Sequence, residues 1–184
     1  ITDTSPDTIN AEPDPVEAFG ILRRVAENSG RPMVYTLAQR NSLPEMFDRL
    51  LELNKQAFDA GVNIRPVFPP RAIGVLLGLQ ASQTPFSGCP TFKRLNDLPL
   101  AEKVAKLRDP AIRAAILSED PVKESTFPLI HRMSYGHMFR FGLKDYIPQA
   151  RDSVAAIAER DGLTAPEVAY DMLLENDGKS FIYM

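Results

Sequence analysis

Arg71 is the residue whose type and position best suit it to bind a small charged ligand. It follows the run Val67–Pro70, just past the C-terminal end of a predicted strand. Its planar guanidinium could hold a carboxylate through two parallel, charge-assisted hydrogen bonds. The alternative is an arginine that covers a loop or pairs with a surface acid. Arg65, earlier in the same strand, is a weaker candidate for ligand binding.

The remaining candidates for chemistry are the two histidines, the single cysteine and two glycines. His131 and His137 are separated by five residues, which suits neither ligation from one helical face nor alternate strand positions, so we expect ordinary hydrogen bonding. Cys89 would be a nucleophile or a bridging thiolate only beside a base or a metal, and we expect a small, semi-buried residue. Gly74 and Gly78 lack the lysine of a phosphate-binding loop and are interpreted as packing or turn glycines.

The composition is that of an ordinary globular protein. The chain is 44% hydrophobic and 24% charged, with a formal net charge of -3. Its basic residues are scattered, so nucleic acid is not an expected partner. The longest apolar run, Ala72–Leu79, is too short to cross a bilayer, and no export signal is visible, so no membrane partner is expected. One cysteine fits a reducing compartment and favours a cytoplasmic protein. The start at Ile1, without an amphipathic period up to Pro15, suggests a cut from a longer chain.

The first half of the chain alternates helix and strand. A helix is predicted over residues 15–28, capped by Asp14 and ended by Gly30, and a second over 44–60. The residues expected to face inward are Ala18, Ile21, Leu22 and Val25 in the first helix, and Phe47, Leu50, Leu51, Ala57 and Phe58 in the second. Residues 33–38 predict a strand buried on both faces, and residues 62–68 predict another. This order predicts a parallel, right-handed crossover and the α/β fold class.

Short helices are predicted after residue 69, where the alternation ends. They cover 98–108, with Asp97 as the expected cap, and 110–117, with Asp109 as the cap. We interpret them as an insertion outside the sheet. Residues 119–146 stay unassigned, because their aromatic residues follow neither a helical nor a strand period.

The last part of the chain has clearer signals. Helices are predicted over 153–160 and 165–175, the latter with a capping box of Thr164 and Glu167. Residues 181–183 predict a final strand.

Several stretches, in consistent order and spacing, resemble one enzyme family. They are Gly30–Leu37, Ala60–Ile64, Pro70–Leu79, Pro85-Phe86, Leu98–Glu102, Leu107–Pro110, Arg113, Ser153–Ala155 and Tyr170–Leu174. They are similar to stretches of amidohydrolases of the N-acyl-D-amino-acid deacylase (D-aminoacylase) type. The chain resembles an internal segment of such an enzyme.

The resemblance implies a metal-dependent hydrolase built on a (β/α)8 TIM barrel, which cleaves the amide C–N bond of N-acyl-D-amino acids or related compounds. Residues 1–80 would supply βα units of the barrel, residues 81–150 an inserted region of short helices and irregular structure, and residues 151–184 a helical return toward the barrel. Arg71 would lie at the mouth of the barrel as a substrate-binding residue. The remainder of the barrel, or self-association, would cover the exposed edges.

The zinc expected in such a parent enzyme needs more ligands than this chain supplies. There is no His-x-His pair, and residues 33–38, where a deacylase could offer a histidine, contain Tyr35 and Thr36. We therefore expect no catalytic or metal-binding residue here and an inactive isolated chain. A non-catalytic α/β binding or interaction module that has lost the metal ligands is the alternative. The sequence fixes neither the acyl group, the metal count nor the oligomeric state.

Overall fold

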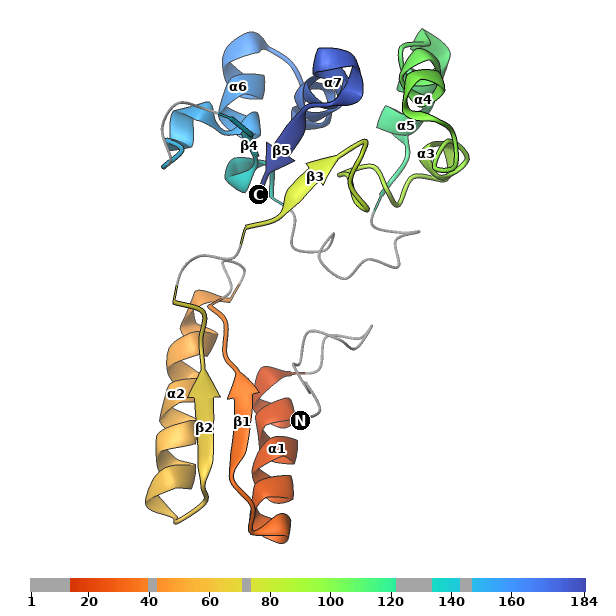
Figure 1. The fold of residues 1–184 in the computed structure, drawn as a ribbon. Coiled ribbons are helices and arrows are strands. Elements are labelled where there is room, and N and C mark those ends of the chain that lie inside the picture. The colour runs from red at the N-terminus through yellow and green to blue at the C-terminus, as the bar shows by residue number, and fades with distance from the viewer. Residues whose placement is uncertain (1–13, 40–42, 71–73, 122–133, 143–146) are drawn as a thin grey trace. The chain divides into compact units, whose positions relative to one another are not determined.

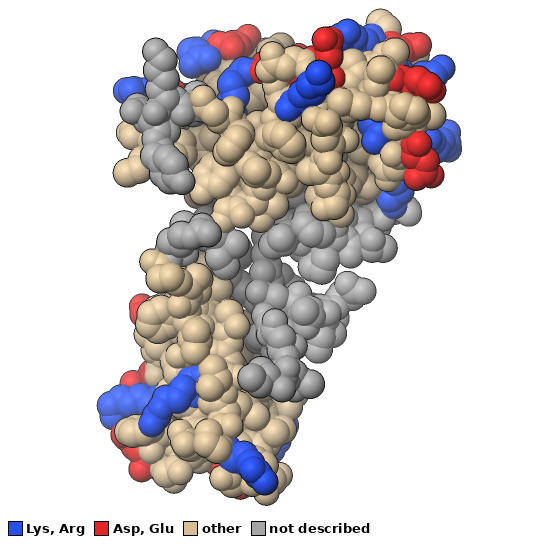
Figure 2. All heavy atoms as spheres, in the orientation of Figure 1, with Lys and Arg blue, Asp and Glu red and all other residues tan. Residues whose placement is uncertain are grey.

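The computed structural model describes residues 14–39, 43–70, 74–121, 134–142 and 147–184. The fold is α/β, as the sequence predicts, and the chain divides into two compact units, residues 1–73 and residues 74–184. No helix within the described ranges is both long enough and apolar enough to cross a membrane. On the face drawn in Figure 2, cationic and anionic side chains are intermingled.

The first unit is built from two helices and two strands (Figure 1). These are α1 (Pro15–Ser29), β1 (Met33–Thr36), α2 (Pro44–Asp59) and β2 (Ile64–Val67). The strands pair in parallel, from Met33 opposite Ile64 to Thr36 opposite Val67. The predicted order of elements and the parallel pairing are confirmed.

Local signals set the ends of α1. The Asp14 carboxylate accepts a hydrogen bond from the Val16 backbone N–H at 3.0 Å, and Pro15 occupies the first turn, where its missing N–H costs nothing. Gly30 ends the helix with φ +60°, a conformation that glycine adopts without strain. Both predicted ends are confirmed.

The hydrophobic core of this unit lies on one face of the two-stranded sheet. Its buried members are Phe19, Leu22, Ala26, Tyr35, Leu37, Leu50, Ala57, Val62 and Ile64. Residues from both helices and from alternate positions of the strands share this cluster, so α1 and α2 cover the same face. The Phe19 and Tyr35 rings meet edge to face, with centroids 5.8 Å apart.

The predicted burial of β1 on both faces is therefore wrong. Val34 is 59% exposed, and Val67 on the neighbouring strand is 54% exposed. Successive side chains of a strand point to opposite faces, and the described part of the unit has helices on one face only. An apolar run does not reveal how many faces of a sheet are covered.

Three residues expected in the helix cores are also exposed. Ile21 and Val25 of α1 are each 49% exposed, and Phe58 of α2 is 50% exposed. The buried side of α1 is centred instead on Phe19 and Leu22, because the large aromatic ring fills the space above the sheet.

The second unit is mainly helical. Its α-helices are α3 (Pro90–Lys93), α4 (Leu100–Leu107), α5 (Pro110–Ser118), α6 (Val154–Asp161) and α7 (Ala165–Gly178). Two 3₁₀ turns, Tyr135–His137 and Ala150–Asp152, lie between α5 and α6.

Most of the predicted caps in this unit are confirmed. Asp109 caps α5, and Thr164 and Glu167 form a reciprocal capping box on α7, as predicted. Ser153, which was expected to be the first residue of its helix, is the N-cap of α6. Asp97 does not cap α4, because that helix begins only after Pro99, which takes the N-cap position without a side-chain hydrogen bond. A capping side chain must come from the residue directly before the helix.

A small antiparallel sheet joins distant parts of the second unit. Its strands are β3 (Leu76–Gly78), β4 (Phe139–Arg140) and β5 (Phe181–Tyr183), in the order β3-β5-β4. The predicted final strand is confirmed as β5. β4 lies within residues 119–146, for which the sequence predicted no helix or strand.

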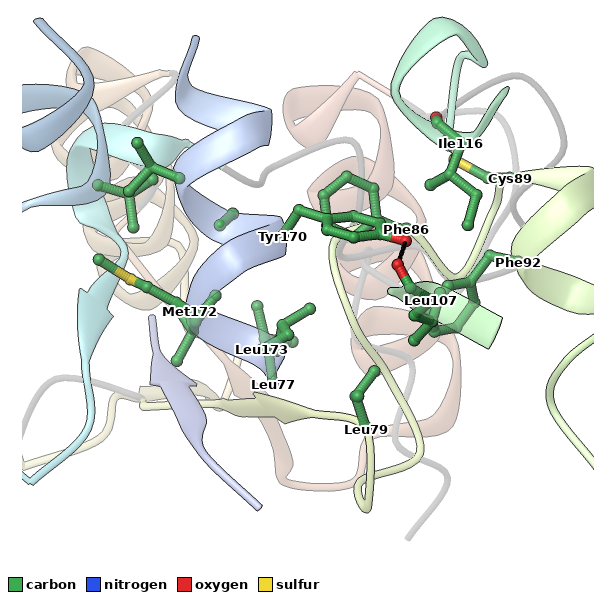
Figure 3. Packing of buried hydrophobic residues seen from close by; sticks show 14 of the residues in the cluster. Leu77, Leu79, Phe86, Cys89, Phe92, Leu107, Ile116, Tyr170, Met172 and Leu173 are labelled. Atoms are coloured by element: carbon green, nitrogen blue, oxygen red, sulfur yellow. Dashed lines mark hydrogen bonds between the residues drawn. The ribbon is translucent and has the colours of Figure 1, made fainter. Parts of the chain in front are cut away.

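A single core holds the second unit together (Figure 3). It draws on residues of β3, of the five α-helices described in this unit and of β5, so the regions expected as an insertion and as a helical return share one core. At its centre, the buried Tyr170 hydroxyl donates a hydrogen bond to the Leu107 carbonyl at 2.8 Å and ties α7 to α4. The Tyr170 ring meets Phe86 edge to face at 5.4 Å.

The Gly88→Ala substitution should strongly destabilise the protein. A Cβ at residue 88 would lie 1.6 Å from the Pro121 carbonyl oxygen, a backbone atom that cannot move aside like a flexible side chain. We expect a loss of at least about 2 kcal/mol in the free energy of unfolding, measured by denaturant titration. Gly136→Ala is the matched control, because its nearest neighbour would be 3.5 Å away. Equal stability of the two variants would contradict this packing.

Candidate functional site at the carboxyl ends of the parallel strands

The two strands of the first unit end side by side. Thr36 lies opposite Val67, and the Leu37 backbone N–H continues the ladder to the Val67 carbonyl at 2.9 Å. In α/β proteins with parallel strands, ligands bind at this carboxyl end, where the loops that follow neighbouring strands meet. The carboxyl end of the β1/β2 sheet is therefore the candidate ligand-binding site.

The described polar side chains at this end are neutral. Thr36 and Gln39 are both exposed, and each offers hydrogen-bond donors and acceptors. Phe68 is held by an edge-to-face contact with Phe47 of α2, with centroids 6.3 Å apart. Such groups can orient a ligand, but they cannot exchange a proton near neutral pH.

Arg71, the predicted carboxylate clamp, lies outside the described residues. In the chain it directly follows Pro70, the last described residue after β2. Its role stays a prediction.

Arg65 lies nearer the start of β2 than its carboxyl end. Its guanidinium lies over the Phe58 ring, 4.3 Å from the ring centroid, a cation–π contact between β2 and the end of α2. This contact gives Arg65 a packing role against the Phe58 ring, which stays half exposed.

The two residues found where a family histidine was expected lie on opposite faces of β1. Thr36 is exposed, whereas Tyr35 is buried among the helices. Burial raises the pKa of Tyr35 to about 12, and its hydroxyl has no hydrogen-bond partner among the residues that the structure describes. Of these two residues, only Thr36 faces away from the core. Because side chains alternate along a strand, knowing that Tyr35 is buried would have predicted that Thr36 is exposed.

The structure describes only one of the two histidine candidates. His131 lies outside the described residues, and His137 is exposed in a 3₁₀ turn of the second unit. Within the described ranges, no three His, Cys, Asp or Glu side chains are grouped closely enough to hold a metal ion.

Gly74 and Gly78 are packing glycines, as predicted. A Cβ at residue 78 would lie 2.5 Å from the Phe181 ring, and one at residue 74 would lie 2.4 Å from the Tyr183 ring. The absence of side chains at both positions lets the aromatic rings of β5 lie directly against the neighbouring backbone.

Cys89 is a fully buried thiol, more enclosed than the semi-buried residue that the sequence predicts. Its Sγ lies 3.7 Å from the Ile116 carbonyl oxygen, to which it donates a weak hydrogen bond (Figure 3). Burial raises the pKa of the Cys89 thiol to about 12, and the negative charges of Glu119 and Asp120 add to the shift. A thiol that stays protonated at neutral pH is not a nucleophile.

Cys89 should therefore resist thiol reagents in the native protein. At pH 8 we expect negligible reaction with an aromatic disulfide reagent under native conditions, because both access and the thiolate form are missing. One thiol per chain should react once denaturant unfolds the second unit. Rapid and complete native labelling would contradict the burial of Cys89.

Comparisons with known protein families, with curated proteins and with solved structures find no match to this chain.

Proposed function

We propose that this chain is part of a metal-dependent amidohydrolase of the N-acyl-D-amino-acid deacylase type, which hydrolyses the amide C–N bond of N-acyl-D-amino acids or related compounds. The observation that supports this proposal best is the one-sided arrangement of the first unit. Its parallel strands carry both helices on one face and end side by side, and Arg71 follows the second strand after Phe68, Pro69 and Pro70.

A TIM-barrel wall requires the same arrangement. In such a barrel the helices lie outside, and the other face of every strand points into the barrel, where bulky β-branched side chains fill the interior. Val34 and Val67 are residues of this kind on the uncovered face. Two neighbouring strands of a (β/α)8 barrel would place them inside, and the loops after β1 and β2 would lie at the mouth.

In this proposal Arg71 binds the carboxylate of the N-acyl amino acid. The guanidinium offers a planar pair of donors that match the two carboxylate oxygens. Thr36 and Gln39 supply neutral hydrogen bonds at the same end of the sheet. These residues hold and orient the substrate, and none of them transfers a proton.

Zinc is the metal proposed for the parent enzyme, where it would polarise the amide carbonyl and activate water. The described residues do not fit a zinc site, because they contain no group of three potential ligands. The ligands would have to come from other parts of the parent enzyme.

The purified 184-residue chain should not hydrolyse N-acyl-D-amino acids above background, with or without added zinc. Metal-dependent hydrolysis needs several protein ligands and an open position for water. Release of the free amino acid is the quantity to measure. Clear zinc-dependent turnover by this chain would contradict the proposal that it is an incomplete enzyme.

Arg71→Ala in the full-length parent should reduce turnover of carboxylate substrates more than turnover of matched neutral amides. Losing a buried, two-pronged contact typically costs about 2–5 kcal/mol, which is roughly a few tens to a few thousandfold in kcat/KM. Arg71→Lys should recover only part of the loss, because an ammonium cannot reproduce the planar fork.

Melting curves of the same variants separate substrate binding from structural damage. A surface or loop-covering arginine would lower turnover of both substrate types equally, together with the melting temperature, and that result would end the proposed role of Arg71. A parent protein that binds these compounds without hydrolysing them would favour the non-catalytic module instead.

A further inference from the structure

The chain contains two Asp-Gly dipeptides, both at helix ends of the second unit. Asp161 is the last residue of α6 and Gly162 is its C-cap, whereas Asp177-Gly178 ends α7, shortly before β5. In such a pair the backbone nitrogen of the glycine can reach the aspartate side chain, because glycine has no Cβ to hinder the approach. The two pairs share this chemistry and differ in their structural surroundings.

The reaction open to an Asp-Gly pair is a dehydration followed by a hydrolysis. A bond forms between the glycine nitrogen and the aspartate Cγ, and the carboxyl hydroxyl leaves as water together with the amide proton. The product is a five-membered cyclic imide. Addition of water at Cγ restores aspartate, whereas addition at the main-chain carbonyl gives isoaspartate, in which the main chain runs through Cβ and Cγ. Water is the only co-reactant, and the mass of the protein is unchanged.

The Asp161-Gly162 pair lies in an open position. Residues 159–164 are all exposed, and a Cβ on Gly162 would meet no described atom within 4 Å. The Asp161 carboxylate accepts a hydrogen bond from Arg160 Nε at 3.0 Å, in an exposed ion pair that constrains it little. The Gly162 N–H donates to the Ala158 carbonyl in the last turn of α6. Helix ends fray readily, and fraying here frees the nitrogen and lets the Asp161 backbone rotate.

The Asp177-Gly178 pair is held more firmly. The Asp177 carboxylate is exposed and accepts a hydrogen bond from the Arg108 guanidinium at 3.0 Å, but Gly178 is buried. A Cβ on Gly178 would lie 2.5 Å from Cγ2 of Val104 in α4. β5 begins three residues later and pairs with β3. Rotation of the Asp177 backbone would therefore disturb both the packing against α4 and the small sheet.

Backbone conformation separates the two pairs further. Closing the imide ring turns the glycine nitrogen toward the aspartate Cβ, which at a tetrahedral Cα requires a ψ of about −120°. Asp177 has φ +54° and ψ +44°, so the Gly178 nitrogen lies on the side opposite the Asp177 Cβ. Asp161 is helical, and a typical helical ψ of about −42° needs roughly half that rotation.

We propose that Asp161-Gly162 is a site of spontaneous isoaspartate formation in the native protein, and that the left-handed turn Asn176–Gly178 protects Asp177-Gly178 from the same reaction. The modification adds one atom to the main chain between α6 and the capping box of α7, in an exposed loop that can accommodate it. The same insertion at residue 177 would displace Gly178 and β5. The inference is independent of the proposed hydrolase chemistry.

Ageing of the full 184-residue chain near neutral pH, well below its unfolding temperature, tests this proposal. Isoaspartate is labelled with an isoaspartyl methyltransferase and located by peptide mapping with mass spectrometry. It should accumulate at residue 161 at least about tenfold faster than at residue 177, because the two positions differ in how readily the backbone opens. Asp161→Glu is the control. Its ring would need six members, so the signal at residue 161 should vanish while that at residue 177 is unchanged.

Unfolding separates the effect of the fold from that of the local sequence. In guanidinium chloride both Asp-Gly pairs should form isoaspartate at similar rates, because neither turn persists. The proposal is overturned if no isoaspartate forms at residue 161 of the native chain, or if residue 177 of the native chain reacts as fast as residue 161. It is also overturned if the unfolded chain keeps the difference between the two positions, since the local sequence would then be its cause.

Discussion

The one-sided cover of the β1/β2 sheet is the constraint from which the features of the first unit follow. Side chains alternate along a strand, so helices on one face bury Tyr35, Leu37 and Ile64 and leave Val34 and Val67 exposed. Because both helices lie on that face, the strand ends and the two outer edges stay accessible in the described part of the unit. The proposed substrate binding at the carboxyl ends of the strands would use this arrangement.

The second unit depends on long-range pairing that no local signal predicts. β3 (Leu76–Gly78) pairs with β5 (Phe181–Tyr183), so the sheet joins the two ends of the unit, and the described helices lie between these strands in the chain. Gly78 lies beneath the Phe181 ring, and Tyr170 links α7 to the end of α4. The polar groups in this core serve packing, since the Tyr170 hydroxyl and the Cys89 thiol both donate to backbone carbonyls.

Sequence reasoning was accurate where the determinants are local. Asp14, Asp109 and the Thr164–Glu167 pair act on neighbouring backbone groups, so their patterns identify helix ends directly. The sequence did not predict features that depend on elements distant in the chain. The exposure of Val34 depends on which faces the helices cover. The pairing of β4 depends on β5, which lies far along the chain. At the candidate site, the two strands could be predicted from the sequence. Which of Tyr35 and Thr36 is buried could not, because that depends on which face of the sheet the helices cover.

The described side chains at the strand ends are neutral hydrogen-bonding groups. Thr36 and Gln39 are neutral, the Cys89 thiol is buried in the other unit, and the described residues hold no group of metal ligands. Amide hydrolysis needs an activated water and a proton donor for the leaving nitrogen. In the proposed enzyme these must come from elsewhere in the parent protein. In that proposal this chain would contribute substrate recognition, with the cationic Arg71 binding the substrate carboxylate, which neutral side chains bind less strongly.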